Sequence, residues 1–96
     1  MFKINTTTVP GENIHIVGNI PELGSWDVNQ STEAMHNPNY PVWFLPVSVP
    51  AGTTIQFKFL RKNGGSTTWE GGANRSFTVP ADTQGSTDTP VYTWQP

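Results

Sequence analysis

The chain has 96 residues, of which 12% are charged, with a formal net charge of -2 and no cysteine. This length suits a small domain that buries a modest core and has little room for an enclosed active site. The cationic cluster Lys58, Arg61 and Lys62 is too small to follow a phosphate backbone, which argues against nucleic acid. The absence of cysteine excludes a disulfide framework, a thiol nucleophile and a cysteine-ligated metal.

Short segments with alternating apolar and polar residues follow one another along the chain, separated by turns rich in Gly and Pro. Such segments indicate strands with one buried face. We expect strands over residues 2–8, 13–18, 33–35, 40–49, 54–61, 76–79 and 91–94. Because no stretch shows sustained helical periodicity, the sequence predicts an all-β fold. The expected form is an antiparallel immunoglobulin-like β-sandwich, or open-sided distorted barrel, of about seven to eight strands.

The segments between these strands are expected to be irregular. Residues 19–27, 36–39 and 80–90 each contain Pro among small or polar neighbours. Pro46 points to an edge strand or a bulge in the segment 40–49, because proline cannot donate a ladder hydrogen bond. In the clearest strand, Ile55, Phe57 and Phe59 are expected to point inward.

Trp69 stands between two flexible segments, the Gly-rich tip at 63–66 and the Gly-Gly pair at 71–72. Glu70 and Asn74 beside it add hydrogen-bonding groups, both acceptor and donor. An aromatic face with a few polar groups can hold a sugar, because the C–H face of the ring packs on the aromatic and the hydroxyls need partners. The alternative is a tryptophan that covers one end of a β-sandwich, and these residues alone leave both interpretations open.

Other aromatic residues are candidates for a binding surface. Trp26 lies, like Trp69, in a Gly-flanked loop, and exposed aromatics with polar neighbours are typical of recognition sites. Tyr40 and Trp43 form another candidate group, although Trp43 continues an inward face and fits the rim of the core equally well. Trp94 ends the last expected strand, and we expect it in the core.

Catalytic chemistry finds little support in the sequence. Glycoside hydrolysis needs two carboxylates about 5–9 Å apart across a cleft. The candidates Glu22, Asp27 and Glu70 lie in small loops with nothing to enclose a substrate. His15 and His36 are too few for a metal site and fit surface histidines. Since no nucleophile motif or phosphate loop is present, we expect no catalytic residue, no metal and no cofactor.

Several motifs, in order along nearly the whole chain, resemble carbohydrate-binding module family 20, the starch-binding domains. These motifs are residues 11–14, 17–19, 21–27, 40–43, 49–52, 57–59 and 68–75. The segment 49–69 is especially similar to the C-terminal domain of bacterial cyclodextrin glucanotransferases and maltogenic amylases. The resemblance implies a single starch-binding domain over residues 1–96, with an antiparallel β-sandwich fold and two sites for α-1,4-glucans.

The resemblance also assigns residues to the two sites. The first site takes its stacking tryptophans from Trp26 and Trp69, and its polar partners are Lys58, Glu70 and Asn74. The second site takes Thr8, Gly11, Asn13, Asn37 and Tyr40, with Trp43 as a neighbour. The turn departs from the family pattern, because Val9-Pro10 stands where fungal members place a tyrosine.

A family member of this kind is a non-catalytic module that holds an amylolytic enzyme at starch granules. The implied partners are starch, amylose, maltooligosaccharides and cyclodextrin, together with a fused glycoside hydrolase or transferase domain, and neither nucleic acid nor membrane. We expect a monomer and an extracellular, secreted parent enzyme, although this sequence shows neither a signal peptide nor an apolar run of membrane length. An alternative from another class is a protein-interaction β-sandwich whose exposed tryptophans contact a partner protein.

Overall fold

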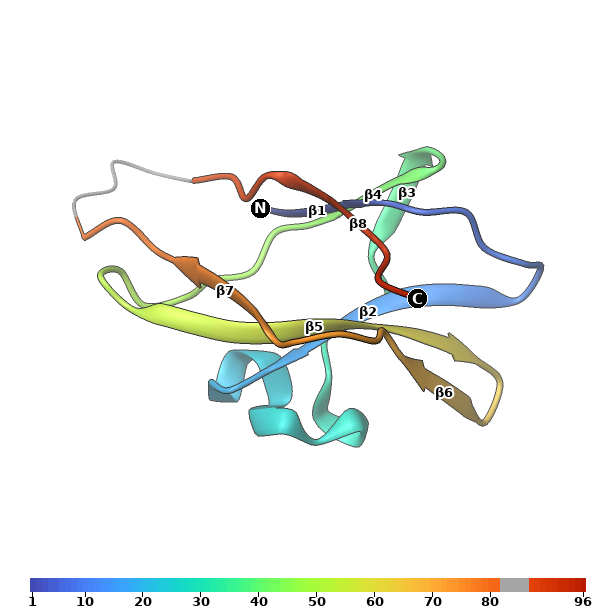
Figure 1. Cartoon of the computed structure of the whole chain (residues 1–96), viewed down its shortest axis with the longest axis horizontal. Helices are drawn as coiled ribbons and strands as arrows, with labels where there is room; N and C mark the ends of the chain where they lie inside the picture. The colour runs from blue at the N-terminus through green and yellow to red at the C-terminus, as the bar shows by residue number, and fades with distance from the viewer. Residues whose placement is uncertain (82–86) are drawn as a thin grey trace.

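The computed structural model describes residues 1–81 and 87–96, which form two β-sheets packed face to face (Figure 1). One sheet has the order β3 (His36–Asn39), β4 (Val42–Leu45), β1 (Phe2–Asn5) and β8 (Val91–Thr93). The other has the order β2 (Glu12–Gly18), β5 (Thr54–Asn63) and β6 (Ser66–Trp69), with β7 (Arg75–Thr78) also paired to β5. The predicted all-β sandwich is confirmed, with eight strands among the described residues.

The pairing is antiparallel except where the two ends of the chain meet. Strands β1 and β8 run parallel, with Lys3 opposite Val91. This parallel pair is an exception to the antiparallel pairing that the sequence predicted. A parallel pair needs a long connection, and here the whole intervening chain supplies it.

The long strand β5 organises the core. Ile55, Phe57 and Phe59 are all 0% exposed, as the alternation predicted, and they face the other sheet. Strand β2 pairs with β5 along its whole length, with Ile16 opposite Phe59. Apolar side chains from both sheets, from η1 and from the segment before β3 complete the core; they are Phe2, Ile4, Ile14, Ile16, Leu23, Met35, Trp43 and Leu45.

Three predicted segments differ in the structure. The strand expected at 33–35 is wrong, because the backbone bonds described between this segment and β2 are two widely spaced ones, from Thr32 N–H to the Ile16 carbonyl and from Met35 N–H to the Ile14 carbonyl. Residues 36–39, expected to be irregular, form β3 instead. The strand expected over 40–49 is confined to β4 and ends immediately before Pro46, which cannot donate to the ladder.

The segment after β2 folds into two short 3₁₀ helices, η1 (Pro21–Trp26) and η2 (Val28–Gln30), next to β2 and β5 (Figure 1). Gly24, Ser25 and Trp26 all have positive φ, at 81°, 49° and 67°. Such angles are uncommon for residues other than glycine. In residues 1–81 and 87–96 no helix has the length and apolar character needed to cross a bilayer. Part of the turn-rich segment expected at 80–90, residues 82–86, lies outside the described residues.

Candidate functional site

The structure brings together the two tryptophans that the sequence placed in separate loops. Trp26 ends η1 and Trp69 ends β6, so Trp69 belongs to a strand and not to a loop as expected. Their ring centroids are 6.3 Å apart and their planes differ by 25°. Trp69 is 41% exposed, and Trp26 is half-buried. Two distant segments of the chain therefore build one aromatic surface.

The spacing of the two rings decides how a sugar could lie on them. A ring inserted between two aromatic faces needs roughly 3.5–4.0 Å on each side, which is roughly 7–8 Å between the faces. The centroids of Trp26 and Trp69 are closer than this, at 6.3 Å. A saccharide would therefore stack on the outer surface that the two indoles form together, and successive sugar units could each contact one ring.

Polar groups border this aromatic surface. The Lys58 ammonium donates to the carbonyl oxygens of Glu70 at 3.3 Å and Gly72 at 2.7 Å. A lysine has three N–H donors, so one remains for a ligand hydroxyl. Asn74 is exposed in the connection between β6 and β7, which begins one residue after Trp69.

A second group of predicted residues meets at the turn between β1 and β2. The Thr8 N–H donates to the Tyr40 hydroxyl oxygen at 2.8 Å, and the Tyr40 hydroxyl donates to the Thr8 carbonyl at 3.2 Å. Tyr40 is 48% exposed, so its ring is open to a ligand. Its backbone N–H donates to the carbonyl of Asn37, a residue of β3, at 3.1 Å.

The other residues expected here lie along the same turn. Gly11 has φ of 86°, a conformation that favours glycine, and it sits against the Asn63 side chain. Asn13 is exposed on β2, opposite Lys62 of β5. Gly11 and Asn13 are thus close to Thr8 in the sequence. Among the described residues, no hydrogen bond joins Asn13 to Tyr40.

Comparison with known proteins agrees with this arrangement. The family model of the starch binding domain, CBM_20, matches residues 1–89. The chain belongs to the starch binding domain family. This starch binding domain is a non-catalytic carbohydrate-binding β-sandwich of the type found in cyclodextrin glucanotransferases.

Individual relatives support the same assignment. The domain is 51% identical over 94 residues to cyclomaltodextrin glucanotransferase of Thermoanaerobacterium thermosulfurigenes, covering 95% of this chain and 13% of that enzyme. A crystal structure of gamma-CGTase from alkalophilic Bacillus clarkii matches with a TM-score of 0.87 and 41% identity, over 99% of this chain and 14% of that one. The family 20 CBM of maltotetraose-forming amylase from Pseudomonas saccharophila STB07 matches with a TM-score of 0.72 and 26% identity, over 83% and 88%. This domain thus spans a small part of the enzymes it resembles.

The structure corrects the expected role of Glu70. Its carboxylate was assigned to the first site, but the residue is 1% exposed. Arg75 donates to it from Nε at 2.8 Å and from Nη2 at 3.0 Å, and Phe59 N–H donates at 3.0 Å. A buried carboxylate satisfied in this way cannot reach a sugar hydroxyl, so Glu70 acts by holding the segment between Trp69 and Asn74.

Trp43 is also not a surface residue. It is 1% exposed, and its indole N–H donates to the Thr6 carbonyl at 3.0 Å. The edge of its ring packs against Tyr40, with centroids 6.2 Å apart and planes at 71°. Its burial follows the inward alternation, and its contact with Tyr40 makes it a neighbour of the second group, so its part in binding stays a prediction. Trp94 packs against the core as expected, although it is only half-buried.

The residues that hold the loop of Trp26 in place carry no signal in the sequence. Lys62 donates to the Val28 carbonyl at 2.7 Å and to the Ser31 hydroxyl at 2.6 Å. The Thr32 hydroxyl accepts from Ile16 N–H at 3.0 Å, and His15 Nδ1–H donates to the Thr32 carbonyl at 2.7 Å. Lys62 of the cationic cluster therefore bonds groups within the domain. Its partners Val28 and Ser31 are distant in sequence, so this role could be identified only from the fold.

His15 makes the stability of the starch binding domain depend on pH. Burial lowers the pKa of His15, which the hydrogen bond to Thr32 opposes and the nearby Lys62 reinforces. The unfolded chain therefore binds a proton more readily than the folded domain as the pH falls below about 6.5. We expect the free energy of unfolding to decrease as pH falls through this range, and His15→Gln to reduce that decrease. Urea unfolding at about pH 5 and about pH 8 measures it; equal pH dependence in both proteins would contradict this account.

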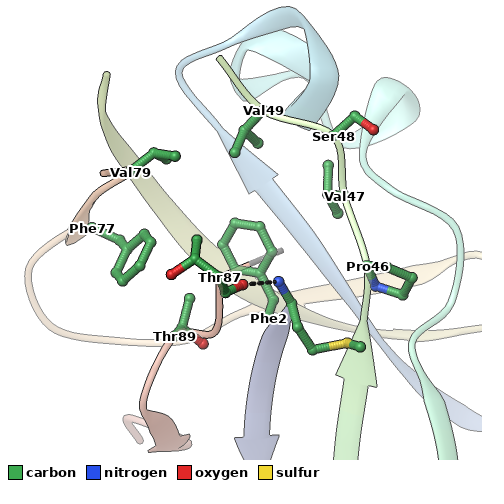
Figure 2. A pocket seen from close by; sticks show the side chains of 10 residues that line it. Phe2, Pro46, Val47, Ser48, Val49, Phe77, Val79, Thr87 and Thr89 are labelled. Carbon is green, nitrogen blue, oxygen red and sulfur yellow. Dashed lines mark hydrogen bonds between the residues drawn. The ribbon is translucent and has the colours of Figure 1, made fainter. Parts of the chain in front are cut away.

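A separate pocket of about 450 Å³ lies toward the end of the sandwich away from the β5–β6 hairpin (Figures 1 and 2). Its lining residues are Met1, Phe2, Pro46, Val47, Ser48, Val49, Phe77, Val79, Thr87 and Thr89. The Met1 amino group donates to the Thr87 carbonyl at 2.7 Å, as Figure 2 shows. None of the expected site residues lines this pocket. No cluster of three or more His, Cys, Asp or Glu able to hold a metal occurs within 1–81 and 87–96.

Proposed function

We propose that this domain binds α-1,4-glucans of starch, including amylose, maltooligosaccharides and cyclodextrin, at two sites. The first site comprises Trp26, Trp69, Lys58 and Asn74. The second comprises Tyr40 with Thr8, Gly11, Asn13 and Asn37 around the β1–β2 turn. The observation that carries the proposal is the near-parallel pair Trp26 and Trp69, whose rings approach to 6.3 Å from separate elements.

The geometry of the first site suits a curved glucan. Amylose is a loose helix, and its curved run of glucose units presents apolar ring faces on one side. Two indoles whose planes differ by 25° follow such a curve, so consecutive units can stack on Trp26 and Trp69. Lys58 and Asn74 at the border would then bond the 2- and 3-hydroxyls. Stacking on an open surface gives modest affinity, and micromolar binding corresponds to about -8 kcal/mol.

Two sites on one domain would raise the effective concentration of the protein on a granule. We therefore propose that residues 1–96 act as one domain that holds a fused amylolytic catalytic domain at starch, as a monomer within a secreted, extracellular enzyme. The relatives that this chain matches support this proposal, because they include cyclomaltodextrin glucanotransferases. In that role the domain supplies binding, and the fused domain supplies the chemistry.

Calorimetric titration with β-cyclodextrin tests the two sites separately. We expect the parent to bind two equivalents and Trp69→Ala and Tyr40→Ala each to lose about one. Losing a stacked ring costs roughly 1–3 kcal/mol by analogy with bases stacked on aromatics, which lowers the affinity of that site about 5- to 150-fold.

Each of the other outcomes has a clear meaning. If only Trp69→Ala changes binding, the Val9-Pro10 turn has disabled the second site. If the folded parent gives no heat at any temperature tried, starch binding is wrong for this chain and a partner protein becomes the better candidate for the Trp26–Trp69 surface. Circular dichroism of each variant establishes that the loss does not come from unfolding.

A further inference from the structure

Arg61 reaches from β5 across the open end of the sandwich to the β1–β2 turn. Its Nη2 donates to the Thr6 hydroxyl at 2.8 Å and to the Thr7 carbonyl at 3.1 Å. These residues immediately precede Thr8, whose backbone N–H and carbonyl both bond the Tyr40 hydroxyl. Arg61 therefore holds the backbone at Thr6 and Thr7, next to Thr8, the residue that bonds the Tyr40 hydroxyl.

Two further contacts hold the guanidinium in place. Its central carbon lies 4.1 Å from the centroid of the Trp94 ring, a cation–π arrangement. Its Nε lies 3.7 Å from Glu12 Oε1, the oxygen that accepts from Val9 N–H at 3.2 Å. Arg61 thus touches both ends of the turn, at Thr6 and Thr7 on one side and through Glu12 on the other.

The Nε atom of Arg61 faces the Glu12 carboxylate. It is buried and has no hydrogen-bond partner among the described residues. A buried donor without a partner is unfavourable, and Glu12 Oε1 is the nearest charged acceptor described, beyond hydrogen-bond distance. Within the part of the chain that the structure describes, Arg61 Nε is therefore held by its ion pair with Glu12 and not by a hydrogen bond.

We propose that Arg61, seated on Trp94, is a positioning residue for the second glucan site. It holds the β1–β2 turn so that Thr8 keeps the Tyr40 ring in an orientation ready for stacking. This inference rests on the proposed function, because it requires a second site at Tyr40. Preorganisation of this kind raises affinity by removing the need to order the turn when the ligand binds. The first site does not depend on this turn, since Trp26 and Trp69 are held by other elements.

Arg61→Lys is the sharpest variant, because it keeps the charge and the apolar stem. An ammonium cannot stack flat on Trp94 while it bonds Thr6 and Thr7 in a planar fork. Each site is measured alone with β-cyclodextrin by calorimetry, the second site in Trp69→Ala and the first in Tyr40→Ala. The matched control is Lys3→Arg, a charge-conserving change on β1 at a cation paired with Asp88.

We expect Arg61→Lys to weaken the second site about tenfold in the Trp69→Ala background, which is the order of affinity gained by ordering one or two side chains in advance. The first site in the Tyr40→Ala background should change less than about twofold, and Lys3→Arg should change neither. An unchanged second site, or an equal loss at both sites together with a lower melting temperature, would overturn the proposal. If Trp69→Ala with Arg61 intact shows no binding at all, the second site is absent. The proposed two-site function is then wrong about the second site, and the role proposed for Arg61 is wrong as well.

Discussion

Glu70→Ala is expected to lower the free energy of unfolding by about 3–5 kcal/mol, the usual cost of removing one partner of a buried ion pair. The Glu70 side chain is 0% exposed and the Arg75 side chain 13% exposed. Without Glu70, the guanidinium stays over the rings of Phe59 and Tyr92, 5.4 and 4.6 Å from their centroids, with its counter-charge removed. The loss is a large share of the about 5–15 kcal/mol that stabilises a small domain.

Urea unfolding measures the change, and an exposed ion pair provides the control. Lys3 and Asp88 lie 3.4 Å apart with side chains 32% and 60% exposed. Asp88→Ala should therefore cost less than about 1 kcal/mol. If Glu70→Ala is as mild as Asp88→Ala and yet removes one equivalent of β-cyclodextrin binding, the carboxylate reaches the sugar and the structural role assigned to it is wrong.

A paired replacement separates the ion pair from the shape of the site. Glu70→Met combined with Arg75→Leu removes both charges and keeps apolar volume, so we expect it to recover much of the stability lost in Glu70→Ala. Part of the loss should remain, because Glu70 also accepts from Phe59 N–H at 3.0 Å and Gln95 N–H at 3.3 Å. First-site binding should persist in the folded double variant, because Trp26 and Trp69 are still held by η1 and β6.

The core of the fold could be predicted because it depends on local alternation. Ile55, Phe57 and Phe59 alternate with polar residues, and a half-buried strand must place such residues on one face. The same alternation correctly turned Trp43 inward. For Trp43, the alternation of neighbouring residues predicted the burial better than its grouping with Tyr40 as a surface aromatic. Burying a large apolar ring is strongly favourable, so the position on the inward face decides.

The role of Glu70 could not be predicted in the same way. Charged side chains are almost never fully buried unless they are paired, and its flexible, Gly-rich neighbours suggested exposure. Its partner Arg75 is close in sequence, but the pair becomes buried only because β8 and the segment after it cover them. Arg75 donates to the Thr93 carbonyl, and Gly71 N–H donates to the Gln95 carbonyl at 2.8 Å.

Sequence patterns did not predict η1, which ends at Trp26, or β3, which directly precedes Tyr40. Every residue of β3 is exposed, so the strand carries no alternation to detect. The turn at Trp26 depends on positive φ at Ser25 and Trp26, which residue preferences argue against. The segment at Trp26 is held by Lys62 of the distant strand β5, whereas β3 pairs with the neighbouring β4 and Tyr40 after it bonds Thr8. The pairing of Trp26 with Trp69 therefore followed from the family resemblance and not from periodicity.

Trp43→Ala is expected to lower the free energy of unfolding by about 3–5 kcal/mol, because it opens a large cavity in the core. Trp43→Phe keeps most of the apolar ring but leaves the Thr6 carbonyl without the indole donor that lies 3.0 Å away. That milder change should cost about 1–3 kcal/mol. In both variants the folded fraction should still bind two equivalents of β-cyclodextrin, since the side chain is 1% exposed.

Tyr40→Ala is the matched comparison, because it removes the neighbouring ring that packs edge-on against Trp43. Tyr40 is 48% exposed, so we expect a smaller loss of stability than in Trp43→Ala together with the loss of one binding equivalent. Denaturation curves and calorimetric titrations on the three variants resolve the two effects. A Trp43→Phe protein that keeps its stability but loses the second equivalent would return Trp43 to the binding surface. The expected result, stability lost at Trp43 and binding lost at Tyr40, would instead place the boundary between core and glucan site between these two contacting rings.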